Sequence, residues 1–197
     1  MSHPILRVCV FCGSSFGNRL SYREAARELA AAMNEMGYSL VYGGAHVGLM
    51  GLIADTMLES GAEVIGVIPR QLLEKEIAHR GLTKLHAVET MHERKALMAD
   101  LADAFVALPG AYGTLDELFE IITWAQLGIH RKPIGILNVE GYYDHMLAFL
   151  DGCTANGLLK QSNRELFLVD TNARRLLERM SEHHPAPVLK WMGPETR

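Results

Sequence analysis

The spacing of apolar residues along the chain alternates between a strand-like and a helix-like pattern. Short apolar runs are typical of buried strands, and apolar residues three and four positions apart are typical of amphipathic helices. The pattern predicts strands over Ile5–Phe11, Ser39–Tyr42, Glu63–Ile68, Ala104–Leu108, Pro133–Val139 and Leu166–Val169. It predicts helices over Ser21–Met36, Gly48–Ser60, Met91–Ala102, Thr114–Leu127, Tyr142–Thr154 and Asn172–His183. Ser21, with Glu24 three residues later, has the spacing of a capping box for the first helix.

Strands that alternate with helices indicate a mostly parallel sheet, because two parallel strands need a crossover connection between them. Right-handed crossovers place helices on both faces of such a sheet. We therefore predict a doubly wound, Rossmann-like α/β fold, and a length of 197 residues favours a single domain over residues 1–197. Ligands of such folds bind outside the carboxyl ends of the strands, so the loops that follow the strands are the places to look for a site.

Composition and charge restrict the classes of partner. The chain is 49% apolar and 21% charged with a net charge of −4, which is typical of a globular protein without a basic surface for nucleic acid or membranes. The uncharged run Met36–Ala54 contains five glycines and His46, a pattern that does not fit a membrane-spanning helix. The start of the chain lacks the pattern of a secretory signal, and we expect a cytoplasmic protein without a membrane or nucleic-acid partner.

The cysteines and histidines do not suggest a metal or redox site. Cys9 and Cys12 have C-x-x-C spacing, but on a strand their side chains would leave opposite faces, so we expect them to pack in the core. Three cysteines cannot all be paired, and the nine histidines show no H-E-x-x-H or other tight ligand spacing. We expect no metal and no cofactor.

Three loops that follow strands are rich in glycine or serine: Cys12-Gly13-Ser14-Ser15, Gly43-Gly44-Ala45-His46-Val47-Gly48 and Pro109-Gly110-Ala111-Tyr112-Gly113-Thr114. None is a P-loop or a G-x-G-x-x-G motif. In the third loop, Gly110 and Gly113 allow backbone N–H groups to approach an anion, and Thr114 begins a helix whose positive end attracts phosphate. The alternative is an ordinary turn in which Thr114 caps the helix and Glu117 completes a capping box.

Charged residues occupy unexpected positions in the predicted helix Met91–Ala102. Arg94 and Lys95 lie within its apolar stripe, where an unpaired buried cation would cost several kcal/mol, so either the side chains snorkel or an anion faces them. Glu117 lies one helical turn beyond Thr114, where the sugar attached to a bound phosphate would lie, and Glu120 continues that face. The nearby helix start should favour the ionised form of Glu117.

Several motifs in the same order along the chain resemble the Lonely Guy family. They are Cys12-Gly13-Ser14-Ser15, Val41-Tyr42-Gly43-Gly44, Gly48-Leu49-Met50-Gly51, Met91-His92-Glu93-Arg94-Lys95 and Pro109-Gly110-Ala111-Tyr112-Gly113-Thr114-Leu115-Asp116-Glu117, followed by Thr123-Trp124-Ala125-Gln126-Leu127-Gly128, Lys132-Pro133 and Gly141-Tyr142-Tyr143. The resemblance covers about residues 5–150. Several motifs in one order are far more specific than any one of them.

The resemblance implies a cytokinin riboside 5'-monophosphate phosphoribohydrolase, which cleaves the N-glycosidic bond of AMP modified at N6 and releases the free base and ribose 5-phosphate. Many members also hydrolyse AMP, and the family is usually a homodimer whose partner chain helps to shape the base pocket. Members have also been described as lysine decarboxylases, but nothing around the lysines of this chain resembles a pyridoxal phosphate site.

The resemblance also implies roles for particular residues. It places the catalytic arginine at Arg94, with Lys95 beside it as a substrate-binding residue, and the catalytic glutamate at Glu117. It also implies that one set of loop residues binds the phosphate and that a second set of residues lines the nucleotide pocket. The phosphate-binding set is Gly110, Ala111, Tyr112, Gly113 and Thr114; the pocket set is Ser14, Gly44 and Met91, to which Glu76 and Thr123 are added as further matches.

Two positions depart from the family pattern, because Ala45 and Ala111 replace family glycines. Alanine with a positive φ would cost about 1 to 2 kcal/mol, whereas with a negative φ it adds only a methyl group near the phosphate. The expected reaction passes through an oxocarbenium-like ribosyl transition state, with Glu117 stabilising the sugar or orienting water and Arg94 orienting the nucleotide. The alternatives are a non-catalytic carrier of a nucleotide or of molybdenum cofactor, and an AMP nucleosidase of nucleotide salvage.

Overall fold

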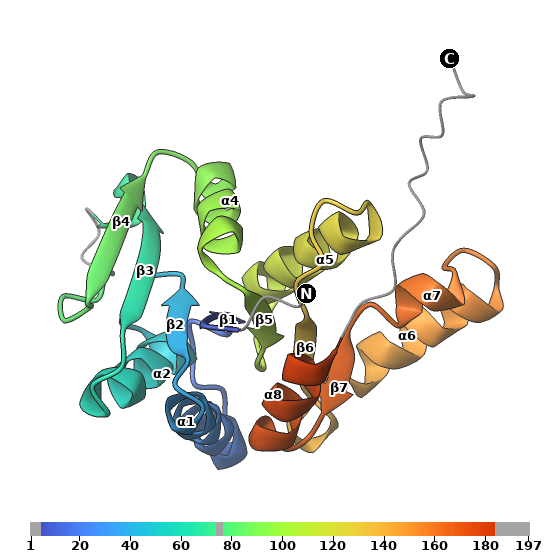
Figure 1. The fold of residues 1–197 in the computed structure, drawn as a ribbon, viewed down its shortest axis with the longest axis horizontal. Coiled ribbons are helices and arrows are strands. Elements are labelled where there is room, and N and C mark those ends of the chain that lie inside the picture. The colour runs from blue at the N-terminus through green and yellow to red at the C-terminus, as the bar shows by residue number, and fades with distance from the viewer. Residues whose placement is uncertain (1–4, 74–76, 184–197) are drawn as a thin grey trace.

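The computed structural model describes residues 5–73 and 77–183, and within these ranges seven strands form one sheet (Figure 1). The strands are β1 (Arg7–Phe11), β2 (Ser39–Tyr42), β3 (Val64–Pro69), β4 (Lys84–Val88), β5 (Ala104–Ala107), β6 (Ile134–Leu137) and β7 (Leu168–Asp170). The helices are α1 (Leu20–Glu35), α2 (Gly48–Glu59), α3 (Arg70–Leu73), α4 (Met91–Leu101), α5 (Tyr112–Gln126), α6 (Asp144–Ala155), α7 (Gln161–Arg164) and α8 (Ala173–Glu182), with a 3-10 turn η1 (Val139–Gly141).

The sheet has the strand order β4-β3-β2-β1-β5-β6-β7, and every neighbouring pair is parallel. The chain therefore builds outward from β1 to one edge, returns to the centre at β5 and builds to the other edge. This confirms the predicted doubly wound, Rossmann-like fold. The order of strands reverses between β1 and β5, so the loops that follow these two strands flank the crevice where such folds bind ligands.

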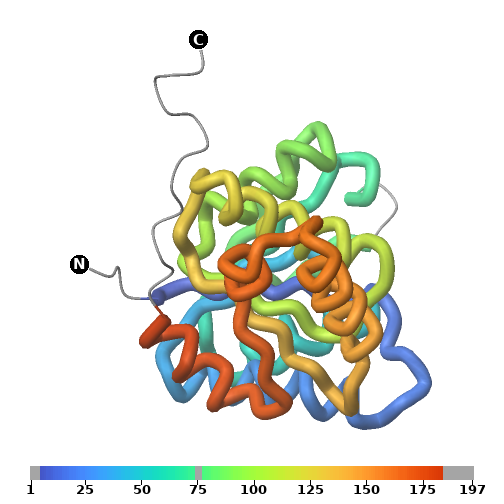
Figure 2. Tube along the Cα trace, turned by 90° about the vertical axis from the view of Figure 1, so that its right-hand side faces the viewer, coloured from blue at the N-terminus to red at the C-terminus, as the bar shows by residue number. Residues whose placement is uncertain are grey.

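Helices cover both faces of the sheet and bury two separate apolar clusters. Helices α1, α2 and α8 pack on one face through residues such as Leu29 and Ile53, and helices α4 and α5 pack on the other through Met98 and Leu118. The two layers lie on opposite sides of the strands in Figures 1 and 2. Because neighbouring residues of a strand point to opposite faces, β1 contributes to both clusters.

The two buried cysteines follow this alternation. Cys9 belongs to the cluster under α4 and α5, whereas Cys12 belongs to the cluster under α1 and α2, and both are free thiols. This confirms the expectation that they pack in the core from opposite faces. The uncharged run noted above forms β2 and the first half of α2, and no helix of the described residues is long and apolar enough to cross a membrane.

Some local predictions were wrong. Helix α1 begins at Leu20 with Arg19 in the cap position and no side-chain cap, so the capping box at Ser21 does not form. Strand β4 was not predicted, because this edge strand is largely exposed and its sequence Lys-Leu-His-Ala-Val lacks the apolar run of the buried strands. The four-residue helices α3 and α7 are too short to show a helical period.

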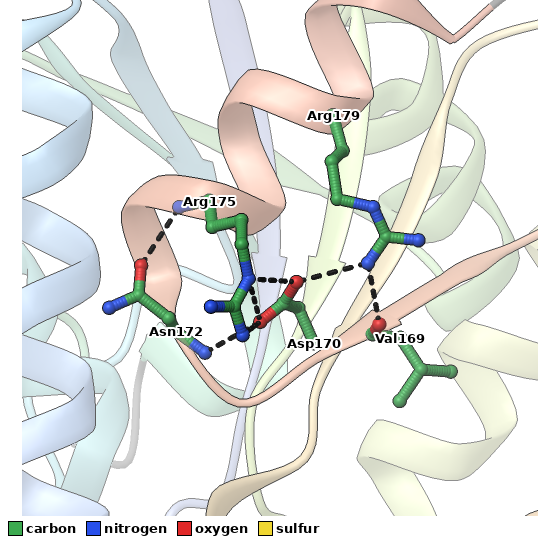
Figure 3. A network of polar contacts seen from close by, with 5 residues as sticks. All are labelled: Val169, Asp170, Asn172, Arg175 and Arg179. Carbon is green, nitrogen blue, oxygen red and sulfur yellow. Dashed lines mark hydrogen bonds and ion pairs between the residues drawn. The ribbon is translucent and has the colours of Figure 1, made fainter.

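A cluster of charged side chains joins the last strand to the last helix (Figure 3). The carboxylate of Asp170, at the end of β7, accepts hydrogen bonds from Arg175 Nη2 at 2.6 Å, from Arg179 Nη1 at 3.0 Å and from the backbone N–H of Asn172 at 2.9 Å. Arg179 also donates to the carbonyl oxygen of Val169 at 2.9 Å. The hydrogen bonds from Arg175 hold the pKa of the Asp170 carboxyl well below its ordinary value.

We predict that Asp170→Asn lowers the free energy of unfolding at pH 7 by about 2 kcal/mol, because hydrogen bonds to a charged group are lost. The folded-state pKa is depressed, so the carboxylate stabilises the fold above the unfolded-state pKa of about 3.9 and loses this effect as the pH falls. Urea unfolding of wild type and variant should therefore differ more at pH 7 than at pH 3. Asp151→Asn, which removes an exposed ion pair with Arg164, is the matched control and should cost less than about 1 kcal/mol at either pH.

Candidate active site

A cavity of about 440 Å³ lies at the carboxyl ends of the central strands. Its walls come from the loop after β1 (residues 13–18), from Gly43 after β2, and from the loop after β5 that leads into α5. Arg94 of α4, Glu117 of α5 and Tyr142 of the turn before α6 also line it. The cavity therefore occupies the crevice that the strand order predicts for a ligand.

Arg94 and Glu117 form a buried ion pair in the cavity wall. The Nη1 atom of Arg94 lies 2.8 Å from the Oε1 atom of Glu117, and each residue is only 8% exposed. The Nε atom of Arg94 donates a further hydrogen bond to the carbonyl oxygen of Val67, within β3, at 3.1 Å. Arg94, although it lies in the apolar stripe of α4, thus faces a carboxylate. Its burial is explained by pairing with Glu117 and not by snorkelling.

The start of α4 fixes the position from which Arg94 projects. Thr90 is the N-cap, and its hydroxyl accepts a hydrogen bond from the backbone N–H of Glu93 at 3.1 Å. The Glu93 carboxylate accepts from the backbone N–H of Glu89, the residue before the cap, at 2.9 Å. These two hydrogen bonds hold the first turn of α4, and Arg94 follows directly after Glu93.

Gly43 permits the close packing of the guanidinium. A Cβ atom on Gly43 would lie 2.0 Å from Arg94 Nη2 and 2.5 Å from Met50 Cε, so any side chain there would displace both. The glycine of the Val-Tyr-Gly-Gly motif is thus required by contact with the ion pair. Neighbouring Gly44 is buried with a φ of +75° and does not line the cavity.

The loop before α5 packs tightly against the other two loops. A Cβ atom on Gly110 would lie 2.0 Å from the hydroxyl of Thr114 and 2.9 Å from the backbone nitrogen of Gly13. The N–H of Gly13 donates to the carbonyl oxygen of Pro109 at 3.0 Å, and its own carbonyl accepts from Leu49 at 3.1 Å. Three loops far apart in the sequence therefore form one connected wall.

Helix α5 begins at Tyr112 with Ala111 in the cap position, two residues earlier than predicted. Thr114 lies inside the first turn and is buried against Gly110, so the interpretation of Thr114 as a helix cap with Glu117 in a capping box is wrong. A Cβ atom on Gly113 would meet nothing within 4 Å, which leaves the helix start open on that side. Its unpaired N–H groups and positive end suit an anion.

The two alanines that replace family glycines do not strain the backbone. Ala111 has a φ of −106°, and among the described residues Glu140 alone is a non-glycine with positive φ, so Ala45 is also outside the left-handed region. Each substitution therefore adds only a methyl group. Ala111 lines the cavity, whereas Ala45 is buried and does not line it.

The electrostatics of Glu117 differ from the expectation. Burial raises the pKa of its carboxyl, and the guanidinium of Arg94 opposes this rise. The helix start was expected to favour the ionised form, but loss of hydration has the larger effect because the side chain is enclosed. Burial also raises the pKa of the Cys12 thiol in the same wall, so this cysteine remains protonated.

Five residues that the resemblance assigns to the substrate lie elsewhere in the described structure. Gly44 is buried and does not line the cavity. Met91 and Tyr112 are 46% and 92% exposed, and neither lines it. Lys95 lies 3.1 Å from both Asp116 and Glu120, and the hydroxyl of Thr123 donates to the carbonyl of Phe119 at 2.7 Å. Thr123 borders a separate shallow depression on α5 that includes Asp116 and Glu120.

The other predicted residues divide between the cavity and the undescribed segment. The lining includes Ser14, Gly110, Ala111, Gly113 and Thr114 together with the ion pair. Glu76 lies outside the residues that the structure describes. In the described ranges, no group of three or more histidine, cysteine, aspartate or glutamate side chains is arranged to hold a metal ion.

Sequence reasoning missed the aromatic side of the cavity. Phe16, Tyr22 and Tyr142 line it, and the rings of Tyr22 and Tyr142 meet edge to face with centroids 5.5 Å apart. Arg23 lies over the Phe16 ring at 4.2 Å. The Gly-Tyr-Tyr motif could have pointed to Tyr142. Phe16 and Tyr22 come from other segments of the chain, which only the fold brings next to Tyr142.

The chain is similar in sequence to known proteins over most of its length. A family model described as "Possible lysine decarboxylase" matches residues 50–180. The cytokinin riboside 5'-monophosphate phosphoribohydrolase LOG5 of Arabidopsis thaliana is 50% identical over 179 residues, which cover 91% of this chain and 78% of the relative. The corresponding enzyme LOG of Oryza sativa subsp. japonica is 49% identical and is covered over 74% of its length.

Solved structures show the same fold at much lower identity. The molybdenum cofactor binding protein from Rippkaea orientalis superposes with a TM-score of 0.69 at 15% identity, covering 90% of this chain and 96% of that one. Fold and site thus define an α/β protein with a ligand cavity at the switch point of its sheet. The chain belongs to the Lonely Guy (LOG) family, as both the family model and the plant relatives show.

We predict that Gly43→Ala destabilises the fold by about 1 to 3 kcal/mol, because the added methyl group overlaps the Arg94 guanidinium. In an Arg94→Ala background that overlap is removed, and the cost of Gly43→Ala should become smaller. A double-mutant cycle by urea unfolding measures the difference. Gly152→Ala is the control, because a Cβ atom at this position inside α6 would meet nothing within 4 Å. It should have the same effect in both backgrounds. Equal costs of Gly43→Ala in both backgrounds would contradict the proposed contact.

Proposed function

We propose that the protein is a phosphoribohydrolase that cleaves the N-glycosidic bond of cytokinin riboside 5'-monophosphates, or of AMP, to give the free base and ribose 5-phosphate. The observation that carries this proposal is the 2.8 Å contact between Arg94 and Glu117 in the wall of the cavity that also contains the helix start of α5. The names of the relatives that are about half identical to the chain support the same reaction.

The cavity offers separate places for the parts of a nucleotide. A 5'-phosphate fits the open start of α5, where Gly110, Ala111, Gly113 and Thr114 line the cavity and the N–H groups of the first turn lack helical partners. Glu117 lies one turn along the same helix. A phosphate bound at the helix start would therefore place its ribose beside this carboxylate.

The chemistry follows from the charges. As the bond from C1' of the ribose to the base nitrogen breaks, its electron pair leaves with the base and positive charge develops on the sugar. The Glu117 carboxylate stabilises this charge and orients the water whose oxygen bonds to C1'. Arg94 holds the nucleotide and donates hydrogen bonds toward the departing base. The two protons of the water end on the base and on the new hydroxyl group.

We also propose that the chain acts as a homodimer in the cytoplasm. Thr123, which the resemblance assigns to the substrate, borders the depression on α5, where Phe119 is exposed. Lys95, also assigned to the substrate, pairs with Asp116 and Glu120 of its lining. A partner chain at this face would give these residues a role in the base pocket. The three cysteines are free, which suits a reducing compartment.

A carrier of a nucleotide or of molybdenum cofactor has less support. A carrier would use the anion-binding loop but would have no need of the buried arginine and glutamate in contact. The structural similarity to a molybdenum cofactor binding protein, at 15% identity, concerns the fold alone. Chromatography of AMP incubated with the protein distinguishes the two, because a carrier returns AMP intact.

We predict that Glu117→Gln and Arg94→Ala each lower the rate of adenine release from AMP or isopentenyl-AMP by about 100- to 1,000-fold, because each removes a charge that stabilises the transition state. Circular dichroism should show that both variants remain folded. Glu178→Gln on the exposed face of α8 is the matched control and should retain the wild-type rate. Near-normal turnover by both site variants would contradict the proposed roles.

We predict that kcat/KM for isopentenyl-AMP exceeds that for AMP by about 10-fold or more, since an apolar substituent that fills a pocket contributes about 1 to 3 kcal/mol per methylene-sized step. Steady-state rates of base release for the two nucleotides measure the ratio. A ratio near one would indicate nucleotide salvage as the role. Tight binding of both nucleotides without hydrolysis would support a carrier.

A further inference from the structure

The turn between β6 and α6 carries two tyrosines that reach back to the loop before α5. The hydroxyl of Tyr142 donates to the carbonyl oxygen of Gly110 at 2.7 Å, and the hydroxyl of Tyr143 donates to the carbonyl oxygen of Leu108 at 2.7 Å. The two acceptors lie on either side of Pro109. Consecutive tyrosines therefore hold consecutive parts of one loop.

The two hydrogen bonds have different consequences for the loop. In a trans peptide the carbonyl and the following N–H lie in one plane and point in opposite directions. Tyr142 therefore fixes the direction of the N–H of Ala111, which lines the cavity at the start of α5. The residue after Leu108 is Pro109, which has no N–H, so Tyr143 orients no donor there.

The turn that carries the tyrosines is held firmly. Asn138, which is buried, accepts from the N–H of Tyr143 at 2.8 Å and donates to the carboxylate of Asp144 at 2.7 Å. Its backbone N–H donates to the carbonyl of Asp170 at 2.8 Å, so the charged cluster of Figure 3 anchors the start of the turn. The tyrosine positions thus depend on contacts outside the cavity.

Two residues of the turn adopt left-handed backbone conformations. Glu140 has a φ of +48° and Gly141 a φ of +72°. Such a conformation is unfavourable for glutamate and persists only where surrounding contacts enforce it. The carboxylate of Glu140 lies 2.7 Å from Arg19 Nη1, at the end of the loop that lines the cavity after β1. The turn is therefore tied to two walls of the cavity.

The ring of Tyr142 is fixed as well as its hydroxyl. It meets Tyr22 edge to face at 5.5 Å and Tyr143 edge to face at 4.9 Å, and it lines the cavity while remaining 39% exposed. Aromatic pairs in this geometry are favourable and restrict the ring. The hydroxyl of Tyr142 is thus presented to Gly110 from a fixed position.

We infer that Tyr142 is a positioning residue for the phosphate group of the ligand. It acts through the Gly110 carbonyl by aiming the N–H of Ala111, and it does not act on the base or on the ion pair. The inference rests on the proposed function for the identity of the ligand, since it assigns the phosphate to the start of α5. Tyr143 stabilises the same loop without orienting a donor.

The test compares Tyr142→Phe with Tyr143→Phe. Tyr142→Phe should raise the Kd for ribose 5-phosphate, measured by calorimetry, by about 3- to 10-fold, the effect of one hydrogen bond. Its kcat/KM for AMP should fall by the same factor through KM, and its affinity for free adenine should not change. Tyr143→Phe should lower Tm by about 2 °C or more, because the Leu108 carbonyl loses its partner in a buried place, while its Kd for ribose 5-phosphate stays within about twofold.

Tyr38→Phe, at a buried position between α1 and β2, is the neutral control. The inference is overturned if both site variants weaken ribose 5-phosphate equally, if Tyr142→Phe binds it as the wild type does, or if adenine affinity falls in parallel. Wild-type protein that binds ribose 5-phosphate but does not hydrolyse either nucleotide would refute the proposed function alone. Hydrolysis by the wild type without the contrast between the tyrosines would refute this inference alone.

Discussion

The buried contact between Arg94 and Glu117 is the constraint on which the arrangement of the site depends. Removing two charges from water is expensive, and the expense is offset only when each charge has close partners. Arg94 contacts the carboxylate and the Val67 carbonyl, and the packing of its guanidinium leaves no room for a side chain at Gly43. The pair therefore ties α4, α5, the end of β2 and strand β3 to one geometry. Burial raises the pKa of Glu117 while the guanidinium opposes the rise, so the same contact sets both the position and the charge of the carboxylate.

The topology of the sheet brings this pair to a place where a ligand can reach it. Because the strand order reverses between β1 and β5, the loops after these strands separate and leave a cavity at the carboxyl ends of the central strands. The backbone contacts of Gly13 with Pro109 and Leu49 then join the loops into one wall. A close-packed wall of this kind needs residues without side chains at Gly43 and Gly110, whereas Ala45 and Ala111 are accommodated because their backbones lie outside the left-handed region.

Contacts at the far edge of the sheet, at β7, help to position the site. The carboxylate of Asp170 binds α8 to the end of β7, and the carbonyl of the same residue accepts the N–H of Asn138. Asn138 in turn holds the backbone of Tyr143, at the end of the turn whose two tyrosines contact the loop before α5. These hydrogen bonds connect a surface cluster of charges with the loop before α5 that lines the cavity. The last strand and helix therefore belong to the architecture of the site as well as to the fold.

The sequence by itself determined the alternation of strands and helices, and hence the fold class, because burial imposes a period that is visible in the order of residues. It also singled out Arg94 and Glu117, since a charge in an apolar stripe and a carboxylate one turn from a glycine-rich loop are local features. The exposed edge strand β4 carries no such period and was missed. Whether Thr114 caps its helix, whether Ala111 is strained, and which side chains face the cavity were decided by tertiary structure. Met91, Lys95 and Thr123 belong to matching motifs but lie outside the cavity, and Tyr142 reaches Gly110 across 32 positions of the chain, because contacts between distant segments are set by the packing of the whole sheet.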